Sequence, residues 1–303
     1  MKRFLIPLLV GPMLAVAPAF PAEAFPAEVS PVEVSPAETP AAVEAAPART
    51  RDVSIAVTPE GFAAPATLPA GAVTFRVQST DPDGAWLGLV RLRPGVSLDR
   101  YLADLTRAMG DDPIAGGQAV ARDVEMLGGV AVADVPAAAT LRVSPGEHYL
   151  VDFRDVGLPD LAERVRRVRV LPGPTAPVPV PVPAARIVLR DGAFDAPAVL
   201  SGPVRVVNLS RQHNEAMLMP VRPGTTLADL DAFFTAVDAG RDPAGYPFTG
   251  GPTGVVPLSP GRSAVLSADL PAGRYAVVTW VRDLATGTMF AARGMRALIT
   301  LEG

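Results

Sequence analysis

The sequence contains no cysteine among its 303 residues, only two histidines and a single lysine, Lys2. Without cysteine the chain forms no disulfide, carries no lipid-modified cysteine and supplies no thiolate to a metal or a substrate. Aromatic residues make up only 6% of the chain, whereas 34 prolines and 27 glycines are typical of many short strands and turns. The composition therefore favours an all-β protein.

The chain also lacks concentrated positive charge and any recognisable catalytic motif. Its formal net charge is -4, whereas a nucleic-acid-binding surface normally shows a basic excess. No Gly-x-Ser-x-Gly, His-Glu-x-x-His or Gly-x-x-x-x-Gly-Lys sequence occurs. We therefore predict that the protein is not an enzyme, that it binds no nucleic acid, and that its unknown partner is a protein or a component of the cell envelope.

Residues 1–24 have the three parts of a secretory signal peptide. Lys2 and Arg3 come first, an apolar run follows over residues 4–10, and small residues lead to a predicted cleavage after Ala24. A retained membrane-spanning helix is not predicted, because the run is short and spanning needs roughly 20 apolar residues. The mature protein is therefore predicted to be secreted or periplasmic, outside the cytoplasm.

Two proline-rich stretches divide the rest of the chain. Residues 25–50 are rich in Pro, Ala and Glu without core-forming periodicity, which is typical of a disordered tether. Residues 172–184 are predicted to be a linker, because their alternating prolines remove backbone donors and fix an extended path. The sequence thus predicts two folded domains, over residues 51–171 and 185–303.

The two predicted domains repeat the same motifs in the same order. The first matching motif is a strand-like run, at 71–77 and 202–208, and the next is an Arg-Pro-Gly turn, at Arg93 and Arg222. Further matches follow in the same order. Because ordered matches of this kind are the signature of an internal repeat, we infer a duplication.

Alternating apolar and polar residues, as in 73–77, predict strands with one face toward a core. Turn residues separate the strands, as a β-sandwich requires. One helix is predicted in each domain: Ser97 is the N-cap for 98–109, and Thr226 is the N-cap for 227–237. The predicted fold is all-β, with two tandem sandwiches and one inserted helix in each.

The second domain contains motifs that resemble a known family. They are Asn208, the pair His213-Asn214, and the segments 273–280 and 294–301. They resemble the cupredoxins, and more closely the secreted cupredoxin-like proteins of bacteria that carry an extra helix. The resemblance spans nearly all of residues 186–303, and it implies a Greek-key β-sandwich like that of plastocyanin or azurin.

The resemblance also implies where a type 1 copper ion would bind. The family uses a histidine, a cysteine, a second histidine and a methionine, because thiolate and imidazole bind copper strongly while a thioether makes a long axial contact. His213 falls on the first histidine and Met295 on the methionine, but Thr279 replaces the cysteine and Phe290 the second histidine. The matching positions of the first domain are about Gly84, Asp152 and Val165. The resemblance thus implies that type 1 copper is lost and that the protein holds no cofactor.

An alternative is a residual copper site in the second domain. His213, Met217, Met289 and Met295 would bring one imidazole and several thioethers together, and such soft ligands suit Cu(I). Methionines two apart on a strand, such as Met217 and Met219, are also common core filler, and His213 can be a hydrogen-bonded loop residue. Two functions stay open: a non-enzymatic binding or structural module without copper, and an extracytoplasmic copper-binding or copper-handling protein.

Overall fold

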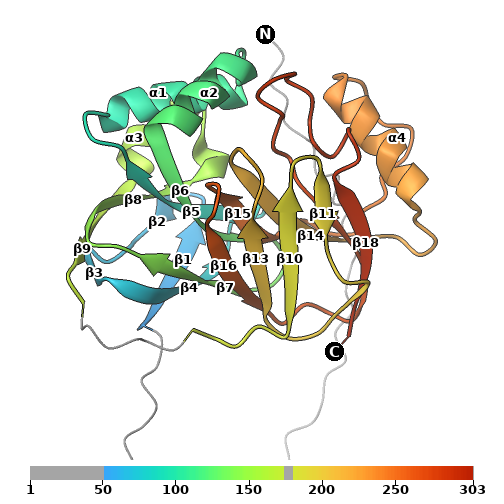
Figure 1. Ribbon diagram of the computed structural model, residues 1–303, viewed down its shortest axis with the longest axis horizontal. Coiled ribbons are helices and arrows are strands. Elements are labelled where there is room, and N and C mark those ends of the chain that lie inside the picture. The colour runs from blue at the N-terminus through green and yellow to red at the C-terminus, as the bar shows by residue number, and fades with distance from the viewer. Residues whose placement is uncertain (1–50, 174–179, 303) are drawn as a thin grey trace, which may run out of the picture. The chain divides into compact units, whose positions relative to one another are not determined.

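A computed structural model describes residues 51–173 and 180–302 (Figure 1). All of them belong to one compact unit, Ala48–Gly303. The predicted signal peptide, the predicted tether and residues 174–179 of the predicted linker lie outside the described residues. In the described part of the chain, no helix is both long enough and apolar enough to cross a membrane.

Both copies of the repeat consist mainly of strands. The first copy contains β1 (Arg51–Thr58), β2 (Gly61–Phe62), β3 (Thr67–Pro69), β4 (Gly71–Ser79), β5 (Ala85–Leu92), α1 (Leu98–Met109), α2 (Pro113–Asp123), β6 (Val124–Val132), β7 (Ala137–Val143), β8 (Gly146–Asp152), the short 3-10 helix η1 (Phe153–Asp155), α3 (Leu161–Arg164) and β9 (Arg166–Leu171). The second copy contains β10 (Ala185–Arg190), β11 (Ala193–Asp195), β12 (Val199–Leu200), β13 (Val204–Asn208), β14 (Asn214–Pro220), α4 (Leu227–Asp238), β15 (Thr253–Leu258), β16 (Ser263–Ala268), β17 (Gly273–Val278) and β18 (Arg296–Leu301). The all-β prediction is confirmed.

The helices α1 and α4 are the two that the sequence predicts. α1 spans the predicted residues, and α4 ends one residue later than predicted. The side chain of Ser97 accepts a hydrogen bond from a backbone amide of α1, and Thr226 forms a capping box with Asp229. Both N-caps are therefore confirmed, because each satisfies amides that have no partner inside the helix.

The first copy has two α-helices besides the one expected, the 11-residue α2 and the four-residue α3, so the prediction of one helix is wrong for this copy. The longer of the two is α2. Asp112 caps it and Pro113 begins it, as is common at a helix start. Its two adjacent glycines lower its intrinsic helix propensity. A Cβ on Gly116 would lie 2.4 Å from the backbone nitrogen of Ala108 in α1. The glycine therefore permits a close helix crossing, which the local sequence did not reveal.

The strands form two mixed sheets, and each copy contributes to both. The eight-stranded sheet has the order β11-β10-β13-β16-β7-β4-β1-β2, and the ten-stranded sheet has the order β12-β18-β17-β14-β15-β6-β5-β8-β9-β3. Each copy is thus a sandwich of two layers. The copies meet where β16 pairs with β7 and β15 pairs with β6, both antiparallel. Because these pairs satisfy backbone groups at what would otherwise be sheet edges, both sheets continue from one copy into the other.

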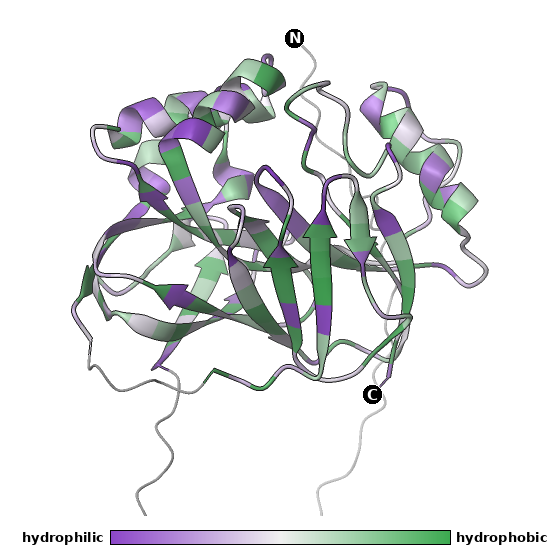
Figure 2. Ribbon diagram, viewed as in Figure 1, coloured by the Kyte–Doolittle hydropathy of each residue, from purple (hydrophilic) through white to green (hydrophobic). Residues whose placement is uncertain are grey.

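Apolar residues fill two layers. One cluster lies between the two sheets, and a second lies on the opposite face of the ten-stranded sheet, beneath α1, α2 and α4. Along β14, Ala216 and Leu218 belong to the first cluster, whereas Met217 and Met219 belong to the second. Figure 2 shows hydrophobic residues along the strands of both sheets. The central strands of the ten-stranded sheet, such as β6 and β14, are therefore buried on both faces, which explains the continuous apolar run of β14.

Candidate functional site

The four positions that the resemblance to the cupredoxins assigns to copper all lie in the second copy and are all buried. His213 immediately precedes β14, and Thr279 immediately follows β17. Phe290 and Met295 lie in the segment that connects β17 to β18. Thr279 and Met295 are each 0% exposed, and His213 is 8% exposed. The fold therefore brings the ends of β14 and β17 and this connecting segment together.

A chain of hydrogen bonds joins two of these positions. The hydroxyl of Thr279 donates to Asn214 Oδ1 at 3.0 Å, and Asn214 Nδ2 donates to Met295 Sδ at 3.4 Å. Thr279 Oγ1 also accepts from the backbone amide of Val281 at 3.1 Å. The polar atoms at the positions of the thiolate and the thioether thus already have partners inside the protein. This arrangement satisfies buried polar groups rather than leaving them free for a metal.

The imidazole of His213 also has a partner, which belongs to the other copy. It hydrogen-bonds the backbone of Val124, the first residue of β6. Burial lowers the pKa of His213 from 6.5 to about 4, and the nearby Arg93 adds to this effect. The ring is therefore neutral at physiological pH, and its contact with β6 links the second copy to the first.

The structure separates the methionines of the predicted residual site. Met295 lies in the cluster between the sheets, whereas Met217 and Met219 lie in the cluster beneath the helices. Met289 is buried near α4, where its backbone amide donates to Asp238 Oδ1 at 2.9 Å. The two apolar clusters are on opposite faces of the ten-stranded sheet. Met217 and Met295 therefore do not share one cluster.

The segment between β17 and β18 is held against the rest of the protein. The side-chain amide of Gln212 donates to the carbonyl of Arg282 at 2.7 Å and accepts from the amide of Leu284 at 3.1 Å. Gln118 of α2 donates to the carbonyl of Leu284 at 3.0 Å. Arg282 forms an ion pair with Asp238 of α4 at 2.6 Å. Helices from both copies thus fix this segment.

Glu215, the residue after Asn214, is a buried carboxyl that sequence reasoning missed. It is 3% exposed, and its Oε1 accepts from the backbone amide of Trp280 at 2.8 Å. Burial raises the pKa of Glu215 from 4.5 to about 7. A glutamate directly before the apolar run of β14 was the available signal, because such a residue is rarely fully buried without a partner.

The first copy contains a related arrangement with different electrostatics. Asp152, at the end of β8, accepts from the backbone amide of Trp86 at 3.0 Å. Arg154 lies against this carboxylate, with its Nη2 2.8 Å from Asp152 Oδ2, and also contacts Asp81. Asp152 therefore has a cationic partner within hydrogen-bonding distance. For Glu215 the recorded side-chain contact is the amide of Trp280.

The residues present do not fit a type 1 copper ion. Two of the four positions, Thr279 and Phe290, carry neither thiolate nor imidazole. Within the described residues, no three or more His, Asp or Glu side chains are grouped so that they could hold a metal ion. The site instead consists of a neutral imidazole, a buried carboxyl and a hydrogen-bonded amide. The carboxyl and the imidazole can bind and release protons, and the amide connects neighbouring segments of the fold.

Comparisons with solved structures give matches to copper proteins. The chain is similar to a reduced auracyanin from Roseiflexus castenholzii, with 19% identity over 39% of this chain and 96% of that one, and a TM-score of 0.24. It is similar to a copper-containing nitrite reductase from Thermus scotoductus, with 11% identity, coverage of 85% and 69%, and a TM-score of 0.24. It is also similar to a multi-copper oxidase from Pediococcus acidilactici, with 11% identity, coverage of 84% and 59%, and a TM-score of 0.25.

No known family model and no curated protein matches the chain. Each of the structural matches is below 20% identity and below a TM-score of 0.3. Nothing about the function of this chain follows from them.

Proposed function

We propose that this chain is a non-enzymatic, cupredoxin-like binding or structural module that binds no type 1 copper and acts outside the cytoplasm. The proposed location rests on the signal-peptide pattern of residues 1–24. The proposed absence of copper rests on the site in the second copy.

One observation carries the proposal. The amide of Asn214 bridges the Thr279 hydroxyl and the Met295 sulfur, at 3.0 and 3.4 Å. These are the positions at which the family would place its thiolate and its axial thioether. A copper ion bound there would have to break both contacts within a buried environment, and it would gain no thiolate in return.

A second observation supports it. The remaining imidazole, His213, is bonded to the backbone of Val124 in the first copy. A copper ion at the imidazole nitrogen that makes this bond would therefore also disturb the junction between the copies. The duplication thus supplies a structural partner for the histidine that the family uses as a ligand.

The test is a copper titration of chelator-treated protein, monitored by visible absorption for Cu(II) and by competition with a chromophoric chelator for Cu(I). We expect no intense blue absorption. We also expect weak and equal Cu(I) uptake by the wild type, by a His213→Ala, Met295→Ala variant, and by the control Met109→Ala, which alters a methionine that is 55% exposed.

Two results would contradict the proposal. Stoichiometric copper with an intense blue absorption would show that a type 1 site exists. Tight Cu(I) uptake that the double variant loses and Met109→Ala retains would instead establish the copper-handling function. The copper content of protein isolated from its native compartment also tests the proposal without a titration, because stoichiometric copper in that protein would contradict it.

A further inference from the structure

No described helix lies over the outer face of the eight-stranded sheet, although several of its outward residues, such as Thr140, Val188 and Val265, are buried. Its inward residues, such as Phe75, Leu141 and Leu266, are buried between the sheets, so the alternate residues point outward. The helix residues that are buried pack against the other sheet. Figure 1 shows β13, β16, β7 and β4 with no helix in front of them.

This outer face contains three arginines whose positive charges are not compensated. Arg186 on β10 and Arg205 on β13 are paired residues of neighbouring parallel strands, and both point outward because Ile187 and Val206 point inward. Arg142 on β7 points outward because Leu141 points inward. None of the three makes a side-chain hydrogen bond or ion pair with a described residue.

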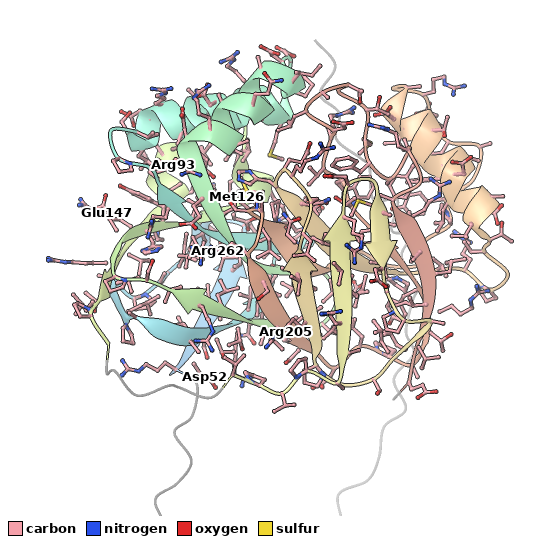
Figure 3. All side chains as sticks on the ribbon, in the orientation of Figure 1. Asp52, Arg93, Met126, Glu147, Arg205 and Arg262 are labelled. Carbon is pink, nitrogen blue, oxygen red and sulfur yellow. The ribbon has the colours of Figure 1, made fainter. Side chains whose placement is uncertain are left out.

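The pairing of two arginines across strands is unfavourable by itself. Strands lie about 5 Å apart, and like charges directly opposite each other destabilise a sheet. Arg205 Nε is in addition buried without a hydrogen-bond partner. Two carboxylates of this sheet pair with other arginines, Asp52 with Arg76 and Asp195 with Arg190. A third carboxylate, Asp269, is exposed and lines a groove on the same face. Figure 3 labels Arg205 and Asp52 among the residues of this sheet. No described carboxylate pairs with Arg142, Arg186 or Arg205, so these three arginines are available to an external anion.

Two hollows lie along the strands of this sheet, and Arg186 lines one of them. That hollow, of about 450 Å³, is lined by Arg186 together with residues that include Val188 and Pro197. The other is a groove of about 540 Å³ that crosses β1, β4, β7 and β16, with small outward residues such as Ala138 and Ser267 among its lining residues. The sheet thus has room for side chains of a bound segment beside Arg186 and, farther along, in this groove.

We propose that this outer face is a docking surface for an extended acidic peptide segment of a partner protein. Its carboxylates would pair with Arg186, Arg205 and Arg142, and its small side chains would fill the groove. The face offers no outward aromatic side chain in its described strands, which sugars and nucleic-acid bases normally need for stacking. Because the whole chain has a net charge of -4, a long polyanion would be repelled elsewhere, whereas a short segment meets only the local positive charge.

The proposal rests on the proposed function, in which the chain is a binding module, and it names the class of partner. The two fail separately. Copper uptake at His213 would contradict the proposed function and would leave peptide binding on the other sheet unchanged. Loss of peptide binding would say nothing about copper.

The test uses the mature chain, treated with chelator, and a short fluorescent peptide of alternating glutamate and alanine, with fluorescence anisotropy at low ionic strength. We expect binding that weakens as salt is added. The variant Arg142→Gln, Arg186→Gln, Arg205→Gln should weaken binding about tenfold or more, because it removes three charge pairs. Its thermal unfolding should be unchanged or shifted upward, because the repulsion between Arg186 and Arg205 is relieved.

A matched control changes the net charge by the same amount. It replaces three exposed arginines outside this sheet: Arg169→Gln, Arg241→Gln and Arg274→Gln. Measured at about 0.1 M salt, this control should bind the peptide within about twofold of the wild type, because charges farther than a Debye length of about 10 Å from the peptide are then screened.

Four results would overturn the proposal. In the first, the control variant loses as much peptide affinity as the triple arginine variant. In the second, a peptide of alternating glutamine and alanine binds as tightly as the glutamate-alanine peptide. In the third, the melting temperature of the triple arginine variant falls by a large amount. The fourth is binding of anionic phospholipid vesicles or heparin through these arginines without binding of the peptide. That result would keep the charged face but replace the occupant.

Discussion

His213 and Glu215 should give the stability of this protein two opposite pH dependences that nearly cancel. The folded state lowers the pKa of His213 from 6.5 to about 4 and raises the pKa of Glu215 from 4.5 to about 7. Between pH 4.5 and 6.5 the unfolded histidine therefore binds a proton that the folded histidine does not. Over the same range, the folded glutamic acid keeps a proton that the unfolded one releases.

The signs follow from proton linkage. For His213, the unfolded state binds more protons, so its contribution is complete above pH 6.5 and is lost as the pH falls toward 4. For Glu215, the folded state binds more protons, so its contribution is complete below pH 4.5 and is lost as the pH rises through 7. Each contribution changes by about 1.4 kcal/mol per pH unit, or about 3 kcal/mol across its whole range.

The perturbation that exposes this balance is Glu215→Gln, which keeps the shape of the side chain and removes its titration. The unfolding free energy of the variant relative to wild type should rise by roughly 2 kcal/mol between pH 4.5 and 6.5. The converse variant, His213→Gln, should fall relative to wild type by a similar amount over the same interval. Because only the change with pH is compared, a constant cost of either substitution does not matter.

Urea unfolding at several pH values measures these differences, provided that the m-value stays constant. An exposed control, Glu302→Gln, should run parallel to the wild type at every pH. If Glu215→Gln also runs parallel to the wild type from pH 4.5 to 7, the carboxyl is not buried as the structure places it. The account of the site would then be wrong.

Three further predictions concern the contacts that hold the fold. Gly116→Ala should destabilise the protein by about 1–3 kcal/mol, because its Cβ would lie 2.4 Å from the backbone of α1. The control Gly117→Ala should cost less, because its Cβ would meet only the end of the Leu284 side chain. Urea unfolding of the two variants measures the difference. Thr279→Val should cost about 1–3 kcal/mol in the same assay, since Asn214 loses a donor and an amide loses its acceptor; a neutral result would contradict the hydrogen-bond chain. Arg262→Gln removes an ion pair with Glu125 that joins the two copies, and it should lower the unfolding free energy by about 1 kcal/mol or less. This loss should become smaller at high salt, because salt screens a partly exposed ion pair.

The sequence correctly predicted those structural elements that depend on residues close to one another in the chain. Ser97 and Thr226 marked the starts of two helices, because a cap depends on residues within one turn. The repeated turns at Arg93 and Arg222 revealed the duplication. The spacing of Met217 and Met219, two apart on a strand, placed both in one apolar cluster. The all-β class followed from the same patterns.

The candidate site was predictable only in part. His213, Thr279 and Met295 were found by resemblance, and the structure places Thr279 and Met295 on the same amide, that of Asn214. The amide bridge itself depends on three segments far apart in the sequence. Glu215 was missed because its burial depends on the cluster beneath the helices and not on its neighbours along the chain.

By itself, the sequence determined that this is an all-β protein with two unequal copies, because residue identity and local periodicity are enough for those conclusions. That the second copy lacks two of four copper ligands is what the resemblance to the cupredoxins implied. Only the tertiary structure decided that both sheets run through both copies, that α2 packs across α1 by virtue of Gly116, and that His213 bonds to Val124 of the other copy. These features arise from contacts between residues distant in the chain, and no local pattern encodes which distant backbone a side chain will meet.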